Sequence, residues 1–185
     1  GRAITAEDED FVSLCAGSGE NWHQLVLHCI NHHWGGVENL SLIPGTAGAA
    51  PMQNIGAYGV EIKNVIESVQ GIEVTTGSFR TFTNADCRFH YRESIFKQEL
   101  KEKYFISSVT LRLTKKNHVL NTSYGAIQDV LKQRSIALPT LRDISDAVIS
   151  IRESKLPDPR VIGNAGSFFK NPGIPLSEAL DIQKE

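Results

Sequence analysis

The sequence predicts an α+β fold built around one sizeable core. Two observations favour helices, because an apolar period of 3.6 residues follows Trp22 and a second one follows Thr140. A third observation favours strands, because apolar and polar residues alternate along residues 104–114. With 185 residues, the chain is long enough to bury such a core.

The first elements are predicted to be a strand, a helix and a long loop. Residues 11–16 are strand-like and end at a Gly-Ser-Gly turn, residues 17–19. We expect Gly35-Gly36 to end the following helix. Residues 40–59 hold glycines, prolines and amides without a sustained period, which predicts a long ordered loop containing a helical turn. The buried face of the helix is predicted to consist of Trp22, Leu25, Val26, Cys29 and Ile30.

The middle of the chain is predicted to be β-structure. Residues 64–70, 72–76 and 79–83 fit a meander with a turn at residues 76–78. The clearest strand is residues 104–114, which alternates between one buried and one wet face. The buried face is predicted to carry Val109, Leu111 and Leu113.

Two helices and a domain boundary follow. Residues 127–134 are predicted to form a short helix, and Thr140 is the expected N-cap of a longer one, with Asp143 near the positive end of its dipole. The prolines of residues 155–159 (KLPDP) end this helix, since each disfavours helical geometry in the residue before it. We therefore expect two domains, residues 1–157 and residues 158–185. The apolar stripe of the longer helix is Ile144, Ala147, Val148 and Ile151.

Composition excludes several classes of protein. The net charge of −2 gives no footprint for nucleic acid or for an anionic membrane surface. No apolar run approaches the roughly 18 to 20 residues of a membrane span, and no secretory h-region opens the chain, so we expect a cytoplasmic protein. Cys15, Cys29 and Cys87 lie far apart, which predicts reduced thiols. Because Met52 is the sole methionine and residues 177–185 open a helix that stops, we expect a piece of a longer protein.

The histidines do not indicate a metal site. His28 and His32 stand four residues apart, with His23 and His33 nearby. No acidic ligand is interleaved among them, and they lie off the apolar stripe. We therefore expect a solvated helix face and no bound metal.

Two further signals are weak. Ser167 does not stand in a Gly-x-Ser-x-Gly elbow, because Phe169 occupies the last glycine position, and this disfavours a serine hydrolase. Residues 17–19 are too short for a dinucleotide fingerprint, which needs three spaced glycines and a later acid. We expect them to form a turn.

Two segments have compositions that suit a ligand site. Residues 42–59 are rich in glycine, alanine and amides, which clear space for a flat ligand on the backbone, although a tight crossover loop is the alternative. Residues 161–172 combine two glycines, two amides, a serine and a lysine with two phenylalanines. Such a mixture suits a polar cluster mounted on a buried base better than a regular helix or strand.

Three motifs together resemble the UDP-N-acetylenolpyruvoylglucosamine reductase family of bacterial cell-wall precursor synthesis. They are residues 41–61 (SLIPGTAGAAPMQNIGAYGVE), 87–97 (CRFHYRESIFK) and 163–172 (GNAGSFFKNP), and the likeness runs through nearly the whole chain in the same order. The resemblance implies the second subdomain of an FAD-binding domain of the vanillyl-alcohol-oxidase-like type in residues 1–157. It implies the beginning of a smaller substrate-binding domain in residues 158–185.

The resemblance also implies a reaction, in which NADPH is the hydride donor, FAD the cofactor and a nucleotide sugar the substrate. The enolpyruvyl ether is reduced to the lactyl ether of UDP-N-acetylmuramic acid. Ser167 matches the family's proton donor, since a carbanionic centre accepts a proton even from a weakly acidic hydroxyl. Arg92 matches the permanent cation beside the substrate carboxylate.

The resemblance assigns binding roles to two further sets of residues. Tyr124 resembles the tyrosine of a mobile loop that closes over the substrate diphosphate. The implied substrate-binding residues are Tyr91, Tyr124, Lys155, Lys170 and Asn171. The implied FAD-binding residues are Pro44, Gly45, Thr46, Gly48, Ala49, Ala50, Asn54, Ile55, Gly56 and Gly59.

Structural roles are the alternatives for the three central residues. Arg92 could instead form a surface ion pair with Glu93 or Glu99, as arginines often do. Tyr91 could pack in the core, and Ser167 could cap a helix that starts at the next residue.

The family's FAD-diphosphate loop and its C-terminal catalytic glutamate have no counterpart in these 185 residues. We therefore expect the chain alone to bind FAD weakly or not at all, to lack turnover and to be prone to self-association, whereas the parent enzyme is expected to be a monomer. Two other functions stay open. One is an FAD oxidoreductase of the same fold with another substrate, and the other is a non-catalytic nucleotide- or flavin-binding module.

Overall fold

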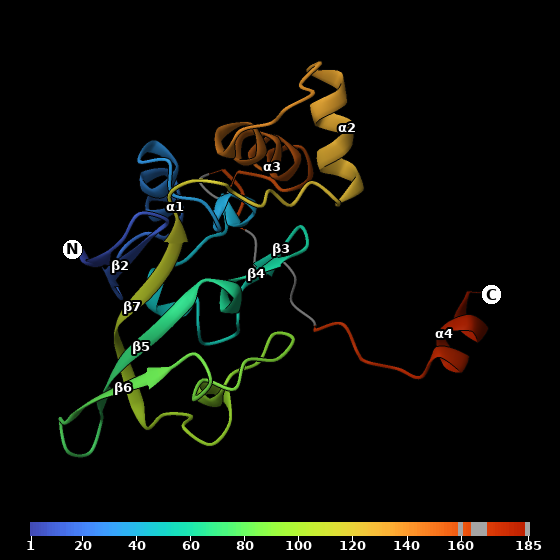
Figure 1. Cartoon of the computed structure of the whole chain (residues 1–185). Helices are drawn as coiled ribbons and strands as arrows, with labels where there is room; N and C mark the ends of the chain where they lie inside the picture. The colour runs from blue at the N-terminus through green and yellow to red at the C-terminus, as the bar shows by residue number, and fades with distance from the viewer. Residues whose placement is uncertain (159–160, 164–169, 184–185) are drawn as a thin grey trace. The chain divides into compact units, whose positions relative to one another are not determined.

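A five-stranded antiparallel sheet forms the frame of the first of two structural units, Gly1–Lys155 and Leu156–Glu185 (Figure 1). The computed structural model describes residues 1–158, 161–163 and 170–183. The strand order is β1-β2-β7-β5-β6. The strands of this sheet are β1 (Arg2–Glu7), β2 (Phe11–Gly17), β5 (Ile66–Glu73), β6 (Phe79–Thr83) and β7 (Tyr104–Thr114). The helices are α1 (Trp22–Asn31), α2 (Gly125–Gln133) and α3 (Leu141–Lys155) in the first unit and α4 (Leu176–Ile182) in the second.

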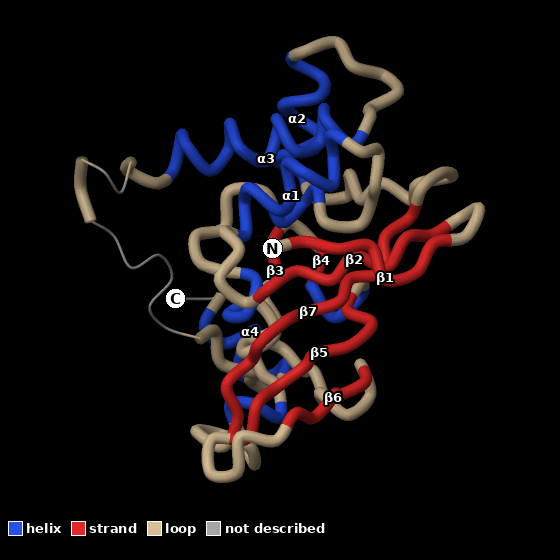
Figure 2. The backbone as a smooth tube through the Cα atoms, turned by 90° about the vertical axis from the view of Figure 1, so that its left-hand side faces the viewer, coloured by secondary structure: helices blue, strands red, loops and turns tan. Residues whose placement is uncertain are grey.

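Strand β7 is the centre of the sheet (Figure 2). Its burial pattern confirms the predicted alternation. It pairs with β2 on one side, where Leu14 faces Leu111, and with β5 on the other, where Val69 faces Val109. Leu111 is fully buried whereas Arg112, the next residue, is exposed. One face of the sheet therefore supplies the main core, as the period of two requires.

Helix α1 covers this apolar face with the residues predicted for it. Trp22, Leu25 and Val26 belong to the same buried cluster as the core residues of β2 and β7. The indole N–H of Trp22 donates to the carbonyl of Leu40 over 2.9 Å. This bond ties the helix to the residues just before residues 42–59, which we call the small-residue segment. Burying a side chain of this size stabilises the fold by about 1.5–3 kcal/mol. Helix α1 therefore fixes the position at which the small-residue segment begins.

Helices α2 and α3 pack against each other around a second apolar cluster (Figure 1). Helix α2 contributes Ile127 and Leu131. The predicted stripe of α3, Ile144, Ala147, Val148 and Ile151, is buried as expected. Helix α3 ends at Lys155, directly before the proline-containing segment.

Two expectations about elements were wrong, and one strand was not predicted. Strand β1 was missed because all six of its residues are exposed, so it carries no apolar period. Residues 64–70 and 72–76 do not form two strands, since β5 continues through Gly71, where a Cβ would lie 3.1 Å from the ring of Tyr104. Helix α1 ends at Asn31 rather than at Gly35-Gly36.

Gly35 has another role, which is to join the sheet. Its N–H donates to the carbonyl of Thr114 over 2.9 Å, and Thr114 returns a bond of 3.1 Å. A Cβ at Gly35 would lie 2.7 Å from the ring of His118 and 2.9 Å from Leu141. The glycine is therefore required by close packing rather than by the helix end.

Replacing Thr140 with alanine is expected to lower the free energy of unfolding by about 1 kcal/mol, because Thr140 caps α3 as predicted. Its hydroxyl accepts from the N–H of Asp143 (3.3 Å), while its N–H and hydroxyl donate to the Asp143 carboxylate (2.8 and 2.6 Å). These bonds hold the pKa of Asp143 below its usual value, the hydroxyl contributing most. The stabilisation is therefore present at neutral pH and is lost as the pH falls through the lowered native pKa.

Urea titrations at neutral and at acidic pH check this expectation. Thr75→Ala, in the exposed turn between β5 and β6, is the control and should change stability by less than about 0.5 kcal/mol. Equal losses for the two variants, or a Thr140→Ala loss that persists in acid, would contradict the capping role.

Within the described residues, no helix combines the length and the apolar character of a membrane span. Cys15, Cys29 and Cys87 are free, as expected. Burial raises the pKa of Cys29 and of Cys87 to about 12, so both stay protonated at neutral pH. The observed elements confirm the α+β class.

Candidate functional site

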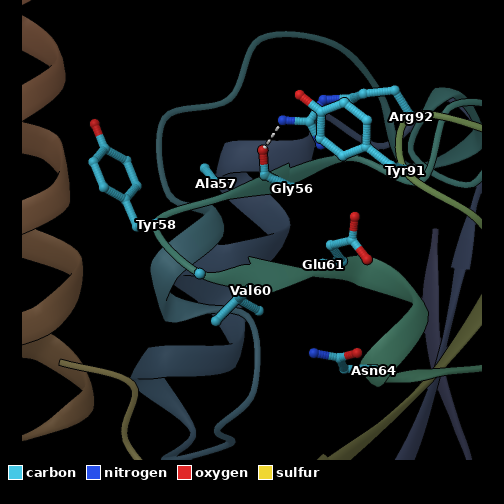
Figure 3. A pocket seen from close by; sticks show the side chains of 9 residues that line it. Gly56, Ala57, Tyr58, Val60, Glu61, Asn64, Tyr91 and Arg92 are labelled. Atoms are coloured by element: carbon cyan, nitrogen blue, oxygen red, sulfur yellow. Dashed lines mark hydrogen bonds between the residues drawn. The ribbon is translucent and has the colours of Figure 1, made fainter. Parts of the chain in front are cut away.

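The small-residue segment ends in a hairpin that lines a pocket (Figure 3). After a 3₁₀ turn at Ala47–Ala49, strands β3 (Gly56–Ala57) and β4 (Val60–Glu61) pair around a two-residue turn. The pocket has a volume of about 370 Å³. Besides the hairpin residues, its lining includes Asn64, Tyr91 and Arg92. Two of the three motifs found in the sequence therefore meet at one place.

The guanidinium of Arg92 lies over the first strand of the hairpin (Figure 3). Its Nη2 donates to the carbonyl of Gly56 over 2.5 Å, and Nη1 lies 3.5 Å from the carbonyl of Asn54. The guanidinium carbon is 5.3 Å from the centre of the Tyr91 ring. A guanidinium has five N–H donors, so these contacts fix its orientation and leave donors for a ligand.

Gly56 makes this position of Arg92 sterically feasible. A Cβ at Gly56 would lie 2.8 Å from Nη1 of Arg92 and 3.0 Å from Cγ of Glu61. Both distances are shorter than carbon normally tolerates, so any larger residue would push the guanidinium away from the hairpin. The sequence needs glycine here for the cation, not for a turn.

Buried hydrogen bonds hold the two motifs together. Asn54 is fully buried, donates to the carbonyl of His90 over 3.0 Å and accepts from the N–H of Lys63 over 3.1 Å. The hydroxyl of Ser94 donates to the carbonyl of Met52 over 2.6 Å. Because bonds to both sides of Arg92 link the segments, its backbone is fixed relative to the hairpin.

Of the two acids considered as surface ion-pair partners of Arg92, Glu99 has another partner. Glu99 pairs with Arg88 over 2.6 Å. Tyr91 is 47% exposed, so it lines the pocket rather than packing in the core. Glu61, which sequence analysis did not single out, also lines the pocket and pairs with Lys63 over 2.6 Å.

A second hollow, of about 400 Å³, lies where the Gly-Ser-Gly turn meets the small-residue segment. The N–H of Gly48 donates to the carbonyl of Ser18 over 2.9 Å, and a Cβ at Gly48 would lie 2.5 Å from Cβ of Ser18. Thr46, Gly48 and Ala49 line this hollow together with Ser18 and Gly19. The turn is thus a turn as expected, but it also forms part of a ligand-sized hollow, which its sequence alone did not reveal.

The predicted FAD-binding residues fall into four groups. Thr46, Gly48 and Ala49 line the second hollow, whereas Gly56 and Gly59 line the first pocket. Pro44 and Gly45 are exposed in the preceding loop. The side chains of Ala50, Asn54 and Ile55 are buried, so a ligand could meet these three residues through backbone atoms alone.

Two tyrosines from different elements meet beside the first pocket. Tyr58, in the turn between β3 and β4, packs edge-to-face on Tyr124, with 5.2 Å between ring centres. Burial raises the pKa of Tyr58, and the nearby guanidinium of Arg152 partly offsets this increase. Arg152 also donates from Nε to the carbonyl of Leu42 over 3.1 Å. The start and the end of the small-residue segment are therefore both close to α3.

The other predicted residues lie outside this constellation or outside the described residues. Lys155 is exposed at the end of α3. Lys170 and Asn171 are exposed residues of the second unit. Ser167 lies outside the described residues.

Histidines and thiols form no metal site among residues 1–158, 161–163 and 170–183, where no group of three ligating side chains gathers. His32 instead stacks on Trp34, with 4.8 Å between the ring centres, and His28 contacts Trp34 edge-to-face over 5.8 Å. Nδ1 of His23 accepts from the N–H of Leu42 over 3.0 Å. These contacts give the histidines structural roles.

Comparison with known protein families indicates the class of protein to which the fold belongs. Residues 2–81 match the FAD binding domain family, and the antiparallel sheet and the two glycine-lined hollows fit the chemistry of a flavin cofactor. The match indicates a flavoprotein fold of the class that takes FAD as its cofactor.

The particular relatives are UDP-N-acetylenolpyruvoylglucosamine reductases. The chain is 53% identical over 185 residues to the reductase of Flavobacterium johnsoniae, with all of this chain and 55% of the relative covered. It is 48% identical over 184 residues to that of Pseudomonas aeruginosa, covering 54% of the relative. The chain is thus a homologue of part of these reductases, and it spans about half the length of the curated relatives it matches.

A solved structure supports the fold. The reductase of Thermus caldophilus superposes with a TM-score of 0.62 at 22% identity, covering 92% of this chain and 53% of that one. The predicted fold class, an α+β FAD-binding domain, is confirmed by this match and by the family match together.

Proposed function

We propose that the full-length protein carrying this chain reduces UDP-N-acetylglucosamine enolpyruvate to UDP-N-acetylmuramate at the expense of NADPH, in peptidoglycan precursor synthesis. The observation that carries the proposal is the guanidinium of Arg92, held over Gly56 at the wall of a pocket formed by the small-residue segment. The names of the relatives support the proposal, because about half of the residues are identical over all or nearly all of this chain.

Arg92 supplies a permanent positive charge in this proposal. A hydride adds to the terminal vinyl carbon of the substrate, and the electron pair of the double bond moves to the carbon beside the carboxylate. Two backbone carbonyls hold the guanidinium in place before the charge develops, so little reorganisation is needed during the reaction. An arginine also keeps its charge when a bound ligand excludes water.

Ser167 supplies the proton in this proposal. Its hydroxyl protonates the carbon beside the carboxylate, which completes the addition of two hydrogens across the double bond. The assignment rests on the match of residues 163–172 to the family motif.

The cofactor is held chiefly by backbone groups. Thr46, Gly48 and Ala49 would lie along it at the second hollow, and Gly56 and Gly59 at the first pocket. Bound FAD supplies the hydride that reduces the substrate and receives its replacement from NADPH. Small residues at these positions let a planar ring approach the main chain.

The substrate is proposed to be the nucleotide sugar, bound by Tyr91, Tyr124, Lys155, Lys170 and Asn171. We also propose a domain boundary between residues 157 and 158. The division of the chain into units at Lys155 and Leu156 supports such a boundary.

We also propose that the protein is cytoplasmic. Three free thiols support this location.

The proposed function predicts that the purified full-length protein consumes NADPH when UDP-N-acetylglucosamine enolpyruvate is present. Mass spectrometry should show a product heavier than the substrate by two hydrogen atoms. UDP-N-acetylglucosamine, which lacks the enolpyruvyl group, is the control. NADPH consumption that is equally fast with either sugar would contradict the proposal and indicate an oxidoreductase with another substrate.

A further inference from the structure

A buried asparagine connects two segments that are far apart in the sequence. Asn39, in a 3₁₀ turn at Glu38–Leu40, is 1% exposed. Its Nδ2 donates to the carbonyl of Tyr58 over 3.2 Å and to the carbonyl of Asn121 over 2.9 Å. Its Oδ1 is buried without a hydrogen-bond partner within the described part of the chain. A buried amide with an unpaired oxygen costs stability, so its two donor bonds must offset that cost.

A second asparagine extends the connection on the other side of the turn. Nδ2 of Asn121 donates to the carbonyl of Gly59 over 3.1 Å. Its Oδ1 accepts from the N–H and from the hydroxyl of Ser123, over 3.2 and 2.8 Å. The contact with Gly59 is close, because a Cβ there would lie 3.0 Å from Nδ2 of Asn121. We call Asn39 and Asn121, with the bonds they make, the amide bridge.

The amide bridge holds the backbone at Tyr58 and next to Tyr124, the two residues that we call the tyrosine pair. Tyr58 is adjacent to Gly59 in the β3–β4 turn, and Tyr124 follows Ser123 directly at the start of α2. Tyr58 has φ +50°, a conformation that side chains other than glycine rarely adopt. Its turn therefore needs external support, which the bonds to the carbonyls of Tyr58 and Gly59 provide.

The tyrosine pair lies beside the first pocket, where a bound ligand would contact it. Tyr58 lines the first pocket, and Tyr124 is 46% exposed, with its ring edge-to-face on Tyr58. Edge-to-face contacts depend on the angle and the distance between the rings. A small shift of either backbone segment would thus move the exposed tyrosine away from the pocket rim.

We propose that Asn39 and Asn121 are positioning residues, which set the affinity for the nucleotide part of the substrate by holding Tyr124 against Tyr58. This inference rests on the proposed function, in which Tyr124 contacts the nucleotide sugar. It assigns no chemical step to the amide bridge. Loss of the bridge should therefore weaken nucleotide binding and leave the turnover rate of the saturated enzyme unchanged.

Asn121→Ala in the full-length protein is the main test, because Asn121 is half-buried and its loss should leave the core intact. UDP, titrated by calorimetry, is the probe. We expect UDP affinity about ten-fold weaker and the KM for the enolpyruvyl substrate raised by about the same factor, with kcat within about two-fold. Gln128→Ala, an exposed amide on the neighbouring α2, is the matched control and should change none of these values.

Asn121→Asp separates the two halves of the bridge. Aspartate keeps the acceptor for Ser123 but loses the donor to Gly59. If the bond to the turn positions the tyrosine pair, this variant should bind UDP as weakly as Asn121→Ala does. UDP binding like that of the unmodified protein would overturn the inference.

The outcomes distinguish this inference from the proposed function. If the unmodified protein does not bind UDP, both are overturned. If it binds UDP and reduces the substrate, but Asn121→Ala binds UDP equally well, the inference alone is overturned. A variant that loses affinity, kcat and melting temperature together would show a purely structural role and would also overturn it.

Discussion

Ser167→Ala in the full-length protein is expected to slow reduction of the enolpyruvyl substrate by about 10² to 10⁴-fold, the range in which a positioned general acid contributes. The rate at which NADPH bleaches the flavin should stay within about two-fold, because that half-reaction needs no proton from Ser167. Stopped-flow absorbance at the flavin band measures the two rates separately. The selective loss follows from the chemistry of the carbon beside the carboxylate, which cannot complete the addition without a proton.

Ser177→Ala is the matched control for this experiment. Ser177 is an exposed serine of α4 in the same part of the chain, so its hydroxyl should influence neither half-reaction. If Ser167→Ala slowed both half-reactions equally, Ser167 would serve the fold or the flavin site. The assignment as proton donor would then be wrong.

The regular elements of the fold could largely be predicted from local patterns. Strand β7 and the buried faces of α1 and α3 were found because their apolar residues follow periods of 2 and 3.6 over many positions. Strand β1 could not be found this way, since an edge strand with six exposed residues is held by its pairing with β2 rather than by burial. Pairing partners that are distant in the sequence leave no local pattern.

Glycine positions show the same limit. Gly35 and Gly71 were expected to interrupt elements, but each allows another part of the chain to approach closely. Local sequence cannot distinguish a glycine that is needed for a turn from one needed for tertiary packing. The fold decides which of the two applies.

The candidate site was predictable where a motif carried it and not where the fold assembled it. Arg92 and the small-residue segment were proposed together from the resemblance, and the structure brings them into contact. Ser18 and Glu61 were missed because a single serine in a turn and a single acid in a hairpin have no distinctive spacing. Asn39 was missed because one buried amide has no local signature at all.

Arg92→Met is expected to lower kcat by about 10² to 10³-fold, the cost of removing one preorganised group that stabilises charge in a transition state. Methionine has a similar length but cannot donate to the carbonyls of Asn54 and Gly56 or face an anion. Arg92→Lys should recover part of the rate, because it keeps the charge but loses the planar fork that matches two acceptors. Steady-state rates at saturating substrate, together with melting temperatures, check both variants.

Arg88→Met is a closely matched control, because the two arginines share a backbone conformation. Arg88 has φ +45° and Arg92 has φ +52°, so methionine meets the same left-handed strain at both positions. Arg88 forms an exposed ion pair with Glu99, which contributes about 0–1 kcal/mol to stability and nothing to the pocket. A large loss of kcat for Arg92→Met with nearly unchanged activity for Arg88→Met would therefore locate the effect in the guanidinium over Gly56. Equal losses for the two variants would place it in the shared loop instead, and the electrostatic role of Arg92 would be wrong.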